Sequence, residues 1–194
     1  MNGKRGSIHA DILKLTYLAV LTALVVVLQL VPIRFGTFEL ALSVPVIVIG
    51  AALCGIGGGA WLGFVFGFVV LLLPGTAAYL SFSPVGTVIT VILKGALAGV
   101  AAAYIYKLLE AKNRYVAALV SAVTATFVNT GVFLIGSLIF FESDISIVIN
   151  VFISINFLIE LAINTVLVPT IYRIINIKKP THSAADGAAG EKSV

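Results

Sequence analysis

Long apolar runs, separated by short polar or glycine- and proline-rich segments, dominate this chain. They cover residues 13–31, 40–54, 59–73, 84–106, 115–141 and 146–172. A helix of about 20 apolar residues crosses the hydrocarbon core of a bilayer. The second and third runs are shorter, and Gly-Ile-Gly-Gly-Gly at 55–59 between them favours a turn over one long helix. The pattern therefore predicts an all-α membrane protein, a bundle of six transmembrane helices.

Composition supports this class. Hydrophobic residues make up 60% of the chain, charged residues make up 10%, and the mean hydropathy is +1.16. A soluble domain has about 25% charged residues. The single cysteine, Cys54, excludes an intrachain disulfide and lies in an apolar run, where we interpret it as a small packing residue.

The basic residues indicate the orientation in the membrane. With six helices both termini lie on one side, and Arg34 is the basic residue expected in a loop on the other side. The positive-inside rule then places both termini in the cytoplasm of a multi-pass protein of the cell membrane. Because topology explains the net charge of +4, we do not expect nucleic-acid binding. The basic residues on the terminal side are Lys4, Arg5, Lys14, Lys107, Lys112, Arg114, Arg173, Lys178, Lys179 and Lys192.

Lys94 and Glu160 depart from this distribution, because both lie deep inside apolar runs. At the rise of an α-helix they would be about 15 Å and about 20 Å from the outer ends of their runs. Charges at that depth are rare and have a partner or a function. Asn156 and Asn164 share a helix face with Glu160, and Asn129 is central in the fifth run. We therefore expect a polar cluster near mid-membrane.

Two interpretations of this cluster remain open. In the structural one, Lys94 and Glu160 form a buried ion pair and the asparagines form hydrogen bonds between helices. In the functional one, the cluster binds a small solute, with Lys94 as a donor or anion partner and the asparagines recognising its polar groups. The outer segment 74–84 would then form a lid, with Tyr79 and Phe82 over the ligand. Alternatively, these two aromatic residues belong to an interfacial belt.

The sequence lacks motifs that are typical of ATPases, histidine-ligated metal sites and Ser–His hydrolases. It has no G-x-x-x-x-G-K-[ST] motif, so it has no phosphate-binding loop of that kind. Its histidines, His9 and His182, lie in the terminal segments, which disfavours a histidine-ligated metal site or a Ser–His hydrolase. We therefore expect neither an enzyme nor a metal site.

Small residues recur every fourth position in three runs. Gly55, Gly59, Gly63 and Gly67 form one such stripe, and Gly95, Gly99 and Ala103 form another, both of which we assign to packing inside the bundle. Ala19-x-x-x-Ala23 is a shorter stripe in the first run.

The chain resembles the substrate-binding S component of energy-coupling factor (ECF) vitamin transporters over roughly residues 10–175. The resemblance rests on the six runs, Ala19-x-x-x-Ala23 and the absence of an ATPase motif. The stretches 50–63 (GAALCGIGGGAWLG) and 84–99 (PVGTVITVILKGALAG) are similar to the group that includes the folate and pantothenate carriers.

The resemblance implies vitamin uptake. An S component binds a vitamin from outside, docks on a membrane T component carried by two ATPases, and topples in the membrane when they hydrolyse ATP. Docking would use Ala19 and Ala23, and the chain itself would bind no cofactor. The ligand would bind in the outer halves of the last three spans, a region that contains Lys94, Asn129 and Asn156. Together with the functional interpretation of the polar cluster, the candidate site residues are Lys94, Asn129, Asn156, Glu160, Tyr79 and Phe82. The expected domains are a cytoplasmic segment at 1–12, the substrate-binding bundle at 13–175, and a disordered cytoplasmic tail at 176–194.

Two other function classes remain. A self-contained secondary transporter or channel would use Lys94 and Glu160 as a proton or ion relay. A scaffold subunit would transport nothing. Recovery of two ATPases and a T component would favour the S component, whereas sensitivity to a protonophore without ATP dependence would favour the secondary transporter.

Overall fold

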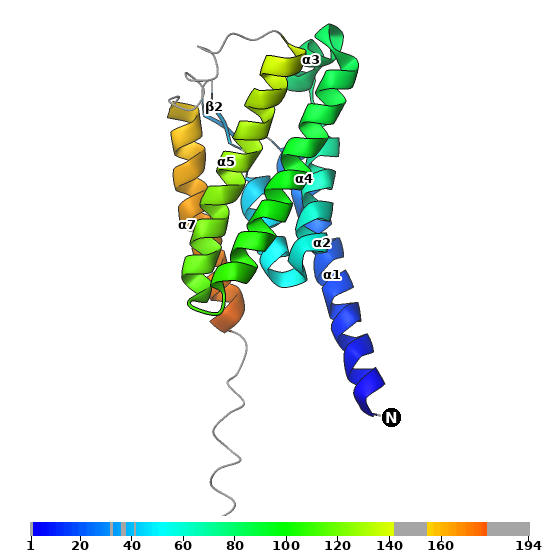
Figure 1. Cartoon of the computed structure of the whole chain (residues 1–194), viewed down its shortest axis with the longest axis vertical. Coiled ribbons are helices and arrows are strands. Elements are labelled where there is room, and N and C mark those ends of the chain that lie inside the picture. Colours follow the sequence, from blue (N-terminus) through cyan, green and yellow to red (C-terminus); the bar gives the residue numbers. More distant parts are fainter. Residues whose placement is uncertain (1, 32, 36–37, 41, 142–154, 178–194) are drawn as a thin grey trace, which may run out of the picture.

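The computed structural model describes residues 2–31, 33–35, 38–40, 42–141 and 155–177. The described part is a bundle of long helices with a small hairpin (Figure 1). Its elements are α1 (Asn2–Leu30), β1 (Ile33–Phe35), β2 (Phe38–Leu40), α2 (Ser43–Leu71), a 3-10 turn (Pro74–Thr76), α3 (Ala77–Phe82), α4 (Pro84–Leu109), α5 (Arg114–Phe140) and α7 (Ile155–Ile177).

Helix α2 is divided by a sharp turn at Gly55, where the backbone leaves the helical region with φ 76° and ψ −164°. A Cβ built on Gly59 would lie 3.0 Å from the Cβ of Ala51. Residues eight positions apart in a straight helix are separated by about 12 Å. The chain therefore folds back on itself at Gly55, and 43–54 lies against 56–71. This confirms the turn predicted from the glycine-rich segment.

The second half of α2 packs on α4 with almost no space between the two backbones. A Cβ on Gly63 would overlap the carbonyl of Gly95, and a Cβ on Gly59 would overlap the carbonyl of Gly99. One on Gly67 would lie 2.6 Å from the carbonyl oxygen of Val91. Only residues without a side chain permit this approach. Apart from Gly55, which forms the turn, the glycines of both stripes thus serve packing inside the bundle, as predicted.

Local sequence explains where α4 and α5 begin. Pro84 occupies the first turn of α4, where a missing N–H costs nothing. At the start of α5, the Oδ1 of Asn113 accepts hydrogen bonds from the backbone N–H groups of Tyr115, at 2.9 Å, and Val116, at 3.2 Å. Side-chain acceptors at this position satisfy otherwise unpaired helix donors.

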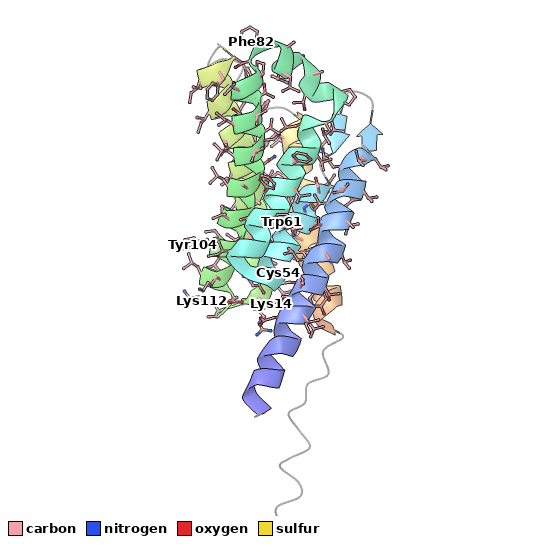
Figure 2. The ribbon with its side chains drawn as sticks, turned by 90° about the vertical axis from the view of Figure 1, so that its right-hand side faces the viewer. Lys14, Cys54, Trp61, Phe82, Tyr104 and Lys112 are labelled. Atoms are coloured by element: carbon pink, nitrogen blue, oxygen red, sulfur yellow. The ribbon has the colours of Figure 1, made fainter. Side chains whose placement is uncertain are left out.

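The helices run up and down, so the connections gather at two ends of the bundle (Figure 1). The start of α1, the Gly55 turn, the α4–α5 connection and the end of α7 lie at one end. The β1–β2 hairpin and α3 lie at the other. Figure 2 shows Phe82 at the α3 end and Lys14, Cys54 and Lys112 toward the opposite end.

In the described part of the chain, four helices are long and apolar enough to cross a membrane, and a fifth apolar helix is shorter. The four are Asp11–Leu30, Ser43–Leu71, Pro84–Leu109 and Arg114–Phe140, and the shorter one is Phe157–Ile171.

The structure adds two details to the predicted elements. Strands β1 and β2 pair antiparallel, with Arg34 opposite Glu39 in the register, which adds a small hairpin to the helical bundle. The outer segment 74–84 is not an open loop, because it contains the 3-10 turn and α3. Helix α1 begins at Asn2, and its candidate span Asp11–Leu30 agrees with the predicted apolar run 13–31. The predicted tail beyond residue 177 lies outside the described residues.

Candidate functional site

Lys94 lies in the middle of α4, half-buried, with its ammonium group between two aromatic rings. Its Nζ is 4.9 Å from the ring centroid of Phe133, on α5, and 5.7 Å from that of Phe66, on the second half of α2. Both distances are in the range of cation–π interactions. The close α2–α4 contact at Gly95, the residue after Lys94, brings Phe66 to this position.

A chain of aromatic contacts joins Lys94 to α3. Tyr79 packs edge-on against Phe133, with ring centroids 5.6 Å apart, and lies 5.2 Å from Phe141. Phe82 is 6.4 Å from Phe141. The two candidate lid residues are therefore connected to Lys94 through Phe133, which the sequence interpretation missed. Its position one helical turn after Asn129 was the signal that could have identified it.

Four buried side-chain oxygens have no hydrogen-bond partner among the described residues. Two are hydroxyl oxygens, Oγ1 of Thr90 and Oγ of Ser121, and the other two are the acceptors Oδ1 of Asn129, a residue 8% exposed on α5, and Oε1 of Glu160 on α7. A buried polar atom left unpaired costs about 1–3 kcal/mol. Each such atom in a native protein requires an explanation, such as a bound water, ion or ligand, and here they lie on the helices that also carry the predicted ligand residues.

Lys94 and Glu160 do not form the buried ion pair of the structural interpretation. Their charges attract each other, but no ion pair within 4.0 Å joins them in the part of the chain that the structure describes.

Asn164 and Trp61 form hydrogen bonds between helices. Asn164, 1% exposed, donates a hydrogen bond from Nδ2 to Oγ1 of Thr126 at 2.9 Å, which joins α7 to α5. The structural interpretation is thus confirmed for Asn164. Asn156 lies in the first turn of α7, but its side chain is outside the described residues. Trp61 donates from Nε1 to Oγ1 of Thr22 at 3.1 Å, away from Lys94.

The groups around Lys94 can bind a polar solute. Among the residues described, no group of three or more His, Cys, Asp or Glu side chains could hold a metal ion. What the cluster offers is a cation, two aromatic rings and unpaired acceptors, which together can hold a polar solute inside an apolar bundle.

Comparison with protein families decides the assignment. A family model described as the substrate-specific component of ECF transporters matches residues 13–172. The chain belongs to this family. No curated protein and no solved structure matches it.

Membership makes the chain a substrate-specific membrane subunit of an ECF transporter rather than an enzyme. In this S component, α1 packs on α2 through Val25, which is fully buried, while Ala19 and Ala23 are exposed on the outer side. The alanine stripe is therefore not used for packing within the described bundle.

Proposed function

We propose that the protein captures a vitamin or related small solute from outside the cell and delivers it inward by docking to an ATP-driven ECF module. This proposal is supported by the ammonium of Lys94, which is half-buried and has no hydrogen bond or ion pair among the described residues. It is also supported by the unpaired acceptors Asn129 Oδ1 and Glu160 Oε1. Unpaired polar groups inside an apolar bundle are costly, and a bound solute would compensate them. Similarity to the folate and pantothenate carriers stays a prediction.

The proposed topology has six spans and two cytoplasmic termini. The reversal at Gly55 supports counting α2 as two spans. The end of the bundle that holds the α4–α5 connection carries Lys107, Lys112 and Arg114, which the positive-inside rule assigns to the cytoplasm. The α3 end would then face outside, so that Tyr79 and Phe82 lie at the entrance for the solute.

The proposed partners are a membrane T component and two ATPase subunits, with lipid around the rest of the bundle. ATP would be used by the partners, and this chain would bind no cofactor. The exposed Ala19 and Ala23 offer a flat face on α1 that another helix can approach closely.

The experiment compares three tryptophan variants of the full chain co-expressed with the ECF module. Ala19→Trp and Ala23→Trp should abolish uptake and recovery of the ATPases, while ligand binding by the isolated protein stays near normal. Leu24→Trp is the matched control, because Leu24 is also exposed but lies about 100° around the helix from Ala23. Undiminished uptake with both alanines replaced contradicts docking at this face.

The same assay tests the alternative that Lys94 and Glu160 act as a relay in a self-contained transporter. Uptake that persists without any ATPase and disappears with a protonophore would favour that function.

A further inference from the structure

The aromatic rings around Lys94 do not supply a hydrogen-bond acceptor. Its ammonium carries three N–H donors, and the faces of Phe66 and Phe133 attract the charge without supplying a hydrogen-bond acceptor. No hydrogen bond or ion pair of Lys94 is present among the described residues. Because the rings exclude water from part of the ammonium, an anionic acceptor would be bound more strongly here than at the surface.

Two of the four unpaired buried oxygens, those of Asn129 and Glu160, need a hydrogen-bond donor. Asn129 Oδ1 and Glu160 Oε1 are both acceptors, so only a donor can satisfy them. Asn129 precedes Phe133 by four residues, which places it about 6 Å along α5 from the ring that contacts Lys94. The donor needed at Asn129 and the acceptor needed at Lys94 thus belong to different parts of a ligand, about one helical turn apart.

We propose that the site takes a small solute that carries an acid group for Lys94 and N–H donors for Asn129 and Glu160. This inference rests on the proposed function and narrows its substrate class. The opposite charges of Lys94 and Glu160 balance each other, so the cluster does not favour a solute with several negative groups. A purely cationic solute would leave Lys94 unpaired, and an acid without any hydrogen-bond donor would leave both acceptors unpaired.

The test measures thermal stability of the purified full chain with a panel of vitamins. Pantothenate and biotin carry both an acid and N–H groups, nicotinate carries only the acid, riboflavin carries N–H without an acid, and thiamine is a cation. The strongest stabilisation should come from a compound with both groups. Its uncharged methyl ester or amide should bind at least about thirtyfold more weakly, as expected when one partner of a charged hydrogen bond is removed.

Two variants make the test specific. In Lys94→Met, the acid and its uncharged derivative should bind with similar affinity. Lys107→Met is the matched control, because Lys107 is exposed at the end of the same helix, and it should keep the thirtyfold difference.

Three outcomes overturn the inference: nicotinate, riboflavin or thiamine as the strongest ligand, equal affinity for acid and ester in the unmodified protein, or no stabilisation by any compound with both groups. Failure of the proposed function is recognised separately, because the ATPases and the T component would then not be recovered with the chain. Recovery of these partners together with thiamine as the ligand would reject the substrate class alone.

Discussion

Replacing Lys94 with methionine separates a role in stability from a role in binding. Methionine has a similar length and would place its thioether against Phe66 and Phe133, where it keeps contact with the rings. The substitution removes the ammonium and little else. Its effect on the ligand-free protein therefore reports how much the bundle depends on that charge.

The structure predicts a small effect on stability. Cation–π contacts contribute about 0.5–2 kcal/mol, and sulfur–aromatic contacts would restore about 0.3–1.5 kcal/mol. The substitution also removes a charge that is costly inside an apolar bundle, so the net change is about 1 kcal/mol or less, and the melting temperature of a chain of this size moves by no more than about 2–4 °C. A broken buried ion pair would cost about 3–5 kcal/mol instead. The smaller value is expected because no ion pair within 4.0 Å joins Lys94 to Glu160.

Binding should respond much more strongly. Loss of one partner in a buried charged hydrogen bond costs about 2–5 kcal/mol, or roughly thirtyfold to several thousandfold in affinity. The assay is calorimetric affinity, for the vitamin that stabilises the protein most, beside ligand-free thermal stability. It includes Lys94→Met, Glu160→Gln, the double variant and the Lys107→Met control.

Two results would refute this reasoning. If Lys94→Met loses 3 kcal/mol or more (about the cost of a broken buried pair) and Glu160→Gln restores most of it, the two residues form a structural pair after all. If affinity is unchanged in Lys94→Met, Lys94 is not part of the ligand site.

Two further predictions concern packing and topology. Gly63→Ala should lower stability by about 1–3 kcal/mol in thermal unfolding, because its Cβ meets the backbone of Gly95. Gly57→Ala is the matched control, with nothing within 4 Å of the added Cβ, and equal losses in both variants would contradict the close packing. Ala185→Cys, in a chain with Cys54 replaced, should resist an impermeant thiol reagent in intact cells, and ready labelling would place the C-terminus outside.

Much of the fold could be predicted because its determinants are local. A run of apolar residues with proline or glycine at its ends specifies a helix and its limits. The turn at Gly55 followed from five residues of sequence. The β1–β2 hairpin and α3 were missed because 33–40 and 77–82 are too short for their apolar residues to show a helical or strand period.

The site was predicted only in part, because its geometry depends on how distant helices pack. Lys94 and Glu160 could be identified from the sequence alone, because a charged residue inside an apolar run is energetically unfavourable. Phe133 is one of 12 phenylalanines in the chain, and only its spacing of four residues from Asn129 distinguishes it locally. Its contact with Lys94 arises because α4 and α5 run antiparallel side by side, a relation between two helices.

The glycine stripes connect the fold to the proposed binding site. Gly95 follows Lys94 directly, and its backbone touches that of Gly63, while a Cβ at position 95 would lie 3.0 Å from Cδ1 of Phe66. A larger residue at either glycine would widen the contact and move the ring of Phe66 away from the ammonium, which needs it within about 6 Å. The same close contact that stabilises α2 against α4 therefore positions one of the two rings on Lys94. For this reason, Gly63→Ala should weaken ligand affinity as well as stability, although residue 63 itself need not touch the ligand.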